Sequence, residues 1–217
     1  MDYAGPETAD FSNVRALNRD YLRLLASDRQ DRLARPATRK RLGSLSPAQT
    51  GHLASAPFLL FSLREMDADY WEEVFDAPPT PDLFIDPVSS SAESSRLVAA
   101  GMGFLWELAR RNPYAARLVS GASLYWCEQI AEQTFCRLLA LVSVKQDMLR
   151  PRCESNLALW QKLLSDGVSR ERVVRDAAHL SALQLVLTDP KSDRQSWPLA
   201  ARAAQTPGLR IADDASS

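Results

Sequence analysis

The residue types that most often bind metals or perform catalysis are sparse in this chain of 217 residues. Its two histidines, His52 and His179, are far apart, and neither belongs to an HxxxH or ExxH pattern. A zinc site requires several His, Cys or carboxylate ligands at short spacing. We therefore expect no metal site and no cofactor, and we interpret both histidines as single structural or surface residues.

The three cysteines, Cys127, Cys136 and Cys153, form no CxxC pair. A nucleophilic cysteine needs a base close by, whereas Cys127 stands beside the apolar Trp126 in a helical pattern, which indicates a buried thiol. The odd count and irregular spacing argue against a disulfide framework and indicate a reducing compartment.

The glycines of "AAGMG", Gly101 and Gly103, follow no strand-like run, so a phosphate-binding loop lacks its structural context. We expect them instead to let two helices approach closely. With no other catalytic or cofactor motif, the sequence predicts a protein that is not an enzyme.

The basic segment "RQDRLARPATRKRLG" is the main candidate for binding. The candidate contact residues are Arg32, Arg35, Arg39, Lys40 and Arg41. Arginine suits phosphate and carboxylate alike, so the segment fits DNA or an acidic partner; the alternative is a solvated helix face. The net charge of −1 lacks the basic excess of a dedicated nucleic-acid binder, so a DNA role requires this local patch or a basic partner.

Helices must position these residues. Apolar residues recur at spacings of three and four, as in Val14, Leu17, Tyr21 and Leu24, which predicts an all-α protein of about eight to ten helices. Ser12 is the expected N-cap of the first helix. The "SPAQ" motif at 46–49 predicts a capping box with proline in the first helical turn.

Two helical units are expected along the chain. The predicted boundaries are a disordered N-terminus at 1–12, a helical unit at 13–76, a Pro/Ser-rich linker or loop at 77–95, a second helical unit at 96–188 and a mostly disordered tail at 189–217. The units show parallel features, with Phe58 matching Phe135 and Trp71 matching Trp160. Duplication and common packing rules both explain this likeness.

The stretch "FLLFSLREMDADYW" poses a choice between strand and helix. The run 58–63 is short and apolar, which suits either a buried strand or a buried helix segment. We favour the helix because no second strand-like run is present to pair with it. In the helix expected next, Trp71 lies four residues before Phe75, which favours a core position over a surface anchor for a partner.

The first unit resembles FlhD, the small subunit of the flagellar master transcription regulator. The resemblance rests on "LNRDYLRLLA" at Leu17–Ala26, "RLGSLSPAQTGHLA" at Arg41–Ala54 and "LLFSLREMD" at Leu59–Asp67. It covers about 60 of the 217 residues, and the family lacks the second helical unit of this chain. It implies an all-helical regulatory subunit, not an enzyme, that dimerises and acts on DNA together with a second subunit.

These observations predict a non-catalytic bacterial regulatory or adaptor protein that acts through protein–protein contacts, with FlhD-like transcriptional regulation as the specific form. The alternative is a structural component of a secretion or motility assembly. We expect a protein partner or a homodimer, and DNA bound through a partner. No apolar run approaches the ~18 residues of a membrane span, and "MDYAGPETAD" lacks a signal-peptide pattern, so we expect a cytoplasmic protein with no membrane contact.

Overall fold

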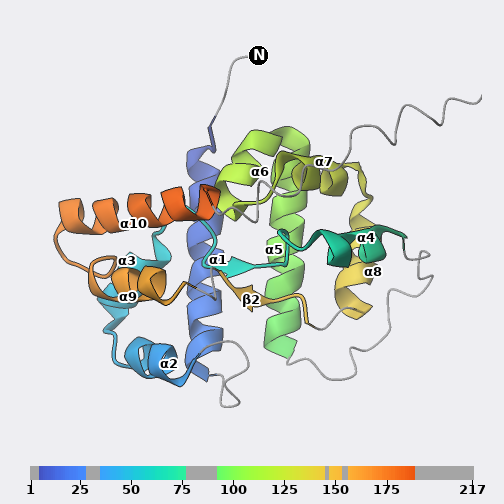
Figure 1. Cartoon of the computed structure of the whole chain (residues 1–217). Coiled ribbons are helices and arrows are strands. Elements are labelled where there is room, and N and C mark those ends of the chain that lie inside the picture. The colour runs from blue at the N-terminus through green and yellow to red at the C-terminus, as the bar shows by residue number, and fades with distance from the viewer. Residues whose placement is uncertain (1–4, 28–34, 77–91, 145–146, 153–155, 189–217) are drawn as a thin grey trace, which may run out of the picture.

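The structure, a computed structural model, describes residues 5–27, 35–76, 92–144, 147–152 and 156–188 (Figure 1). In these ranges the chain forms ten helices and two short strands, so the predicted all-α class is confirmed. The elements are α1 Thr8–Ser27, α2 Pro36–Gly43, α3 Pro47–Ala54, β1 Phe61–Ser62, α4 Ala68–Asp76, α5 Ala92–Arg111, α6 Pro113–Ser120, α7 Leu124–Glu132, α8 Phe135–Val144, β2 Arg150–Pro151, α9 Leu157–Ser165 and α10 Arg172–Leu187.

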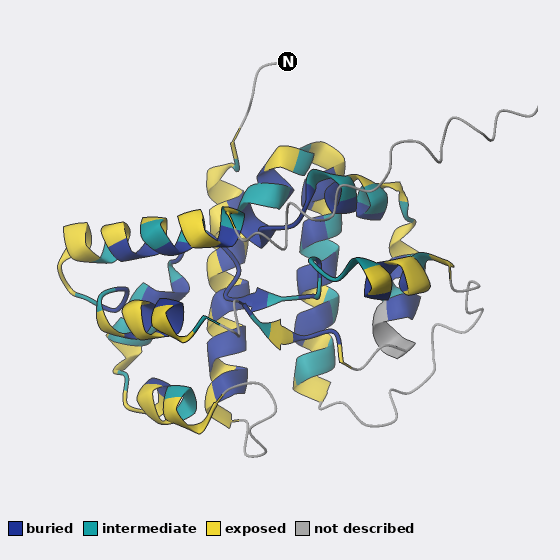
Figure 2. Cartoon of the chain, in the orientation of Figure 1, coloured by how far each residue is buried: buried dark blue, intermediate teal, exposed yellow. Residues whose placement is uncertain are grey.

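The long helix α5 organises the packing. It contacts α1, α6, α7 and α8, and Figure 1 shows α1 and α5 as two upright helices with β1 and β2 beside them. The buried stripes of these helices face inward (Figure 2). One hydrophobic core extends from Val14 in α1 to Val186 in α10, so both expected units contribute to the same core. None of the described helices has the length and apolar character that a bilayer span requires.

Two helices begin earlier than the sequence predicted. α1 begins at Thr8 instead of near residue 13, and the Ser12 hydroxyl donates to the Thr8 carbonyl at 3.0 Å, so Ser12 is not the N-cap. α5 begins at Ala92, inside the segment 77–95 that was predicted as a linker or loop. The rest of that segment, 77–91, and the predicted tail, 189–217, lie outside the described residues.

The predicted capping box at the start of α3 is confirmed. The Gln49 amide donates to the Ser46 hydroxyl at 3.2 Å, and the Ser46 amide donates to the Gln49 side chain at 2.9 Å. These two bonds satisfy backbone groups that have no partner inside the helix, and the proline at the first helical positions loses no bond there.

The prediction of a helix at 58–63 is wrong. The segment is extended and buried, and its strand β1 pairs antiparallel with β2, with Phe61 opposite Pro151. The Asn18 side chain of α1 explains why extended backbone is tolerated here, because it accepts from the Leu60 amide at 2.8 Å and donates to the Phe58 carbonyl at 2.9 Å. A two-residue partner strand that contains proline leaves no strand signal in the sequence.

The extended segment also corrects two related expectations. A Cβ added at Gly101 would lie 3.1 Å from the Phe61 ring, so this glycine of α5 admits the ring of a strand residue and not a second helix. At Gly103 the expectation agrees with the structure, because a Cβ there would lie 3.3 Å from the Phe135 ring of α8. Phe58 is buried in extended backbone, whereas its proposed counterpart Phe135 is an exposed residue of α8. The likeness between the two units therefore does not extend to their apolar runs.

Candidate functional site

The helix α2 presents most of the predicted contact residues to solvent. Arg35, at the N-cap, is exposed, as are Lys40 and Arg41, and Arg39 is half-buried. Arg32 lies outside the described residues. The sequence of α2, PATRKRLG, contains no carboxylate, and Leu42 is its one buried residue. Lys40 and Arg41 lie in the last turn, where the helix dipole favours positive charge.

The adjoining helix α1 carries three exposed arginines that the sequence analysis missed. Arg15, Arg19 and Arg23 follow one another at intervals of four residues and therefore share a helix face. Arg23 forms an ion pair with Asp20 at 2.9 Å, which neutralises part of its charge. α1 and α2 pack against each other. The i, i+4 spacing of exposed arginines was the signal that could have found them.

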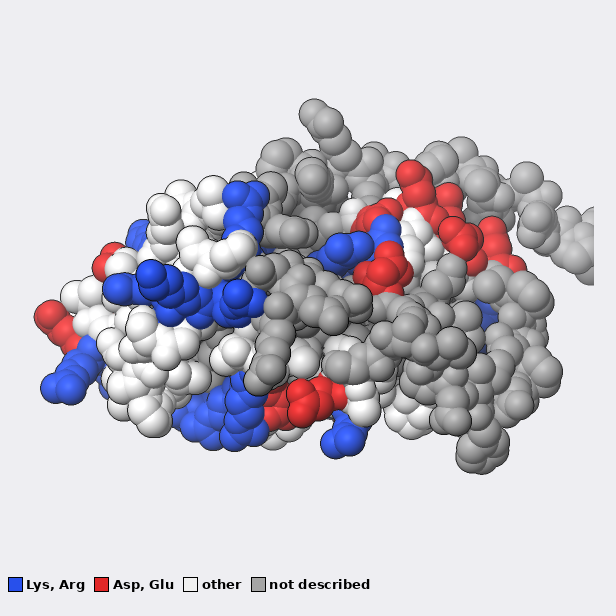
Figure 3. All heavy atoms as spheres, turned by 90° about the horizontal axis from the view of Figure 1, so that it is seen from below, with Lys and Arg blue, Asp and Glu red and all other residues white. Residues whose placement is uncertain are grey.

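We call these seven residues the basic surface: Arg15, Arg19, Arg23, Arg35, Arg39, Lys40 and Arg41. Figure 3 views the molecule from below and shows basic side chains gathered on the side that carries α2. Acidic side chains form one group toward α4 and a second group directly beside the basic ones. Asp20 and Glu93 line a hollow together with Arg23 of the basic surface.

The acidic group toward α4 belongs to a corner built around Arg64. This residue has a φ of 59°, which non-glycine residues rarely adopt. Its guanidinium donates to Asp67 at 2.6 Å and to Asp147 at 2.6 Å, and it lies 3.9 Å from the centroid of the Tyr70 ring. Burial, followed by the charge of Asp147, raises the pKa of Tyr70 to about 12.

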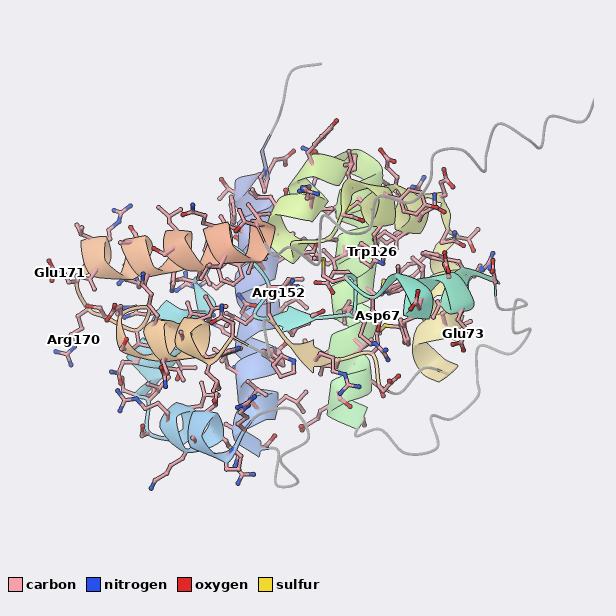
Figure 4. The ribbon with its side chains drawn as sticks, viewed as in Figure 1. Asp67, Glu73, Trp126, Arg152, Arg170 and Glu171 are labelled. Carbon is pink, nitrogen blue, oxygen red and sulfur yellow. The ribbon has the colours of Figure 1, made fainter. Side chains whose placement is uncertain are left out.

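A shallow hollow of about 400 Å³ adjoins this corner and is also lined by Asp69 and Glu73. Figure 4 shows Asp67 just before α4 and Glu73 on that helix. The described residues contain no group of three or more His, Cys, Asp and Glu side chains arranged to hold a metal ion. The contacts of Arg64 with Asp67 and Asp147 join the corner to the segment before β2. These two carboxylates therefore help to stabilise the fold.

Behind the corner lies a buried polar network centred on Arg152 (Figure 4). Its guanidinium forms an ion pair with Glu65 and donates to the carbonyls of Leu59 and Phe61, each at 2.6 Å. Glu65 also accepts from the Leu63 amide at 2.6 Å. The Trp160 indole donates to the Arg152 carbonyl at 2.8 Å. The network supplies partners for backbone that forms no helix, so it stabilises the fold.

Of the remaining candidates for chemistry, Cys127 and His179 are buried, whereas His52 is half-buried. Burial raises the pKa of the Cys127 thiol to about 12, so it stays protonated at neutral pH. His179 is buried in α10, and His52 places its Nδ1 3.3 Å from the Val168 carbonyl. Cys136 is exposed, and Cys153 lies outside the described residues.

The aromatic pair at the start of α4 belongs to the core. Trp71 is 2% exposed, and its ring packs edge-on against Trp126 with centroids 5.3 Å apart. It also contacts Phe75 at 5.3 Å, as the four-residue spacing predicted. The core interpretation of Trp71 is confirmed, and the surface-anchor alternative is wrong for this residue.

Comparison of the chain with protein-family models, with curated proteins and with solved structures gives no match.

Proposed function

We propose that the protein is a non-catalytic regulatory or adaptor protein that contacts a polyanion, nucleic acid in the first place, through its basic surface. The observation that carries this proposal is α2, which presents Arg35, Lys40 and Arg41 to solvent and contains no carboxylate. The arginine row of α1 extends the same kind of charge along the adjoining helix.

The composition of this surface favours nucleic acid over an acidic protein. The anchors of protein interfaces are enriched in Trp and Tyr as well as in Arg. None of the large exposed hydrophobic residues of the described chain lies in α2, and Phe11 is the one in α1. Binding to a phosphate backbone needs no such anchor, because its affinity comes largely from cations that replace condensed counterions.

The burial of Cys127 and of the Arg152 network supports a non-catalytic role. A thiol with a pKa near 12, as in Cys127, is a poor nucleophile at neutral pH. The charged groups of the Arg152 network are all engaged with one another or with backbone. Neither group of side chains is arranged to meet a substrate.

The FlhD resemblance agrees with this proposal, since it implies a regulatory subunit that acts on DNA with a second subunit. FlhD-like regulation stays a prediction, and so does the alternative of a structural component in a secretion or motility assembly. A nucleic-acid contact on the basic surface distinguishes these two functions.

Fluorescence anisotropy with a short labelled DNA duplex tests the proposal. We expect Lys40→Ala/Arg41→Ala to weaken binding by about 10-fold or more at low salt, because each lost cation removes a phosphate contact. The matched control is Arg170→Ala/Arg172→Ala, which removes two exposed cations near α10. No measurable binding by the wild-type chain, or an equal loss in both double variants, would refute the proposal.

A further inference from the structure

A hollow of about 530 Å³ lies between the C-terminal half of α1 and the N-terminal half of α5. Both helices line it with the same pattern, in which an acidic residue is followed by arginine three positions later and by leucine four positions later. Residues at these spacings share one face of a helix. We call this cavity the α1–α5 hollow, and the six residues of its repeated pattern are Asp20, Arg23, Leu24, Glu93, Arg96 and Leu97.

The two halves of the hollow face each other because α1 and α5 run antiparallel (Figure 1). At the other end of this helix pair, Arg111 forms an ion pair with Asp10 at 2.6 Å, which fixes the register of the two helices. Leu24 is as far after Asp10 in the sequence as Leu97 is before Arg111, so the two leucines lie opposite each other. Both leucines are buried. They form an apolar floor with an arginine beside each.

The same register places the two carboxylates, Asp20 and Glu93, at opposite ends of this floor. Each lies four residues before the leucine of its own helix, and the helices run in opposite directions. Arg23 and both carboxylates are exposed, as is Arg96. Arg23 pairs with Asp20 at 2.9 Å, whereas Glu93 and Arg96 have no ion-pair partner among the described residues. The hollow therefore offers water-exposed hydrogen-bonding groups of both signs above an apolar floor.

The hollow adjoins the basic surface but differs from it in chemistry. Arg23 belongs to both, and the arginine row of α1 leads from Arg15 through Arg19 to the edge of the hollow. Phosphate groups suit the row, whereas the carboxylates at the two ends of the hollow repel them. A ligand of the hollow must combine an apolar face with both hydrogen-bond donors and acceptors. An unpaired nucleobase does so, and its face also stacks on guanidinium planes.

We propose that the α1–α5 hollow binds one unpaired base of a single-stranded nucleic acid whose phosphates lie along the arginine row of α1. This inference rests on the proposed function and names the form of nucleic acid that the basic surface recognises. The bases of a duplex stay stacked and paired, and they reach a pocket only when they leave the duplex. Duplex DNA can therefore meet the basic surface through its phosphates but leaves the hollow empty.

The carboxylates determine which base fits best. Asp20 and Glu93 accept hydrogen bonds and donate none when ionised. Cytosine carries an exocyclic amine that donates to a carboxylate. Thymine has no such amine, and its one ring N–H donor lies between two carbonyl oxygens, which a carboxylate repels. The two pyrimidines are similar in size, so a preference for cytosine reports on these carboxylates.

The first test is fluorescence anisotropy of the full chain with labelled oligodeoxycytidine and oligodeoxythymidine of equal length, at mildly alkaline pH and low salt. The two strands carry the same backbone charge. We expect oligodeoxycytidine to bind about 5-fold or more tightly. Equal affinities for the two strands would overturn this inference and leave the phosphate contact of the proposed function standing. Failure of both strands and of duplex DNA to bind would overturn both proposals.

The second test assigns the preference to the hollow. Asp20→Ala/Glu93→Ala removes its two carboxylates, and the matched control Glu72→Ala/Glu128→Ala removes two exposed carboxylates from α4 and α7. Both variants should keep the wild-type melting midpoint, because all four side chains are exposed. The loss of negative charge favours any polyanion in both variants, so the ratio of the two affinities is the quantity to compare.

We expect the ratio of cytidine to thymidine affinity to fall to about 1 in Asp20→Ala/Glu93→Ala and to keep its wild-type value in the control. A preference for oligodeoxycytidine that survives in Asp20→Ala/Glu93→Ala would overturn the proposal, because the carboxylates of the hollow would not be reading the base. An equal loss of preference in the control would overturn it as well.

Discussion

Arg152 reaches from β2 to Glu65 and forms an ion pair that is almost completely removed from water, with side chains 6% and 0% exposed. The same guanidinium donates to the carbonyls of Leu59 and Phe61, on the extended run before the corner. The ion pair therefore joins the end of β2 to the backbone, 87 residues earlier in the chain, on which α4 and the corner depend.

Loss of Arg152 should be among the most damaging single changes. We expect Arg152→Met to lower the free energy of unfolding by about 3–5 kcal/mol, because it leaves the Glu65 carboxylate buried without its partner. Arg150→Met removes the neighbouring arginine, whose side chain is exposed to solvent, and should cost less than about 1 kcal/mol. Urea denaturation measures both, and similar losses in the two variants would contradict this role for the buried pair.

Trp71 should behave as a core residue. Trp71→Ala should lower the free energy of unfolding by about 3–5 kcal/mol, since its ring packs on Trp126 and Phe75. Tyr114→Ala, at an exposed aromatic position of α6, is the control and should leave the midpoint almost unchanged. Thermal unfolding followed by circular dichroism separates the two, and an unchanged midpoint for Trp71→Ala would place this ring outside the core.

Two glycines should respond to alanine in opposite directions. Gly101→Ala should destabilise the chain by about 1–3 kcal/mol, because the new Cβ would press on the Phe61 ring at 3.1 Å. Gly51→Ala, in the middle of α3, meets nothing within 4 Å and should stabilise it by about 0.5–1 kcal/mol. A gain from both changes in urea denaturation would show that Phe61 does not lie against α5 as described.

Acid should loosen α10 through His179. Burial lowers the pKa of this imidazole, with Arg175 and His52 acting in the same direction and the Gly167 carbonyl and Asp176 opposing them. Its Nε2 has no hydrogen-bond partner among the described residues. Because the folded state binds the proton less readily, the full contribution to stability is present above the ordinary pKa of about 6.5 and is lost as the pH falls below it.

The contribution of His179 should therefore appear as a slope. Below pH about 6.5, unfolding free energy should fall by no more than about 1.4 kcal/mol per pH unit from this one group. Urea denaturation across this range should show a shallower decline in His179→Leu than in the wild-type chain. Parallel declines in the two proteins would assign the acid sensitivity to other residues.

Local patterns in the sequence were sufficient to predict the helices. The spacing of Val14, Leu17 and Tyr21 predicted α1, and the motif at 46–49 predicted the capping box of α3, because both depend on residues within a few positions of each other. The start of α1 was misplaced because Ser12, although a good capping residue, lies on the exposed face inside the helix.

The extended segment could not be predicted because its partners are distant in the chain. Asn18 lies 42 residues before Leu60, Arg152 lies 93 residues after Leu59, and both form hydrogen bonds with the backbone of this segment. The residues next to Asn18 and Arg152 in the sequence form no pattern that indicates this role. The spacing of apolar residues predicted α10, whereas the exposure of Val173 and Leu180 on the side opposite Ala178 and Ala182 was not predicted.

The salt dependence of DNA binding tests the central claim most directly. On a plot of the logarithm of the binding constant against that of salt concentration, each phosphate contact contributes about 0.9 to the slope. We predict that Lys40→Ala/Arg41→Ala reduces the magnitude of the slope by about 2, whereas Arg170→Ala/Arg172→Ala keeps the wild-type slope. Equal slopes for all three proteins, or binding that does not respond to salt, would contradict a nucleic-acid contact on the basic surface.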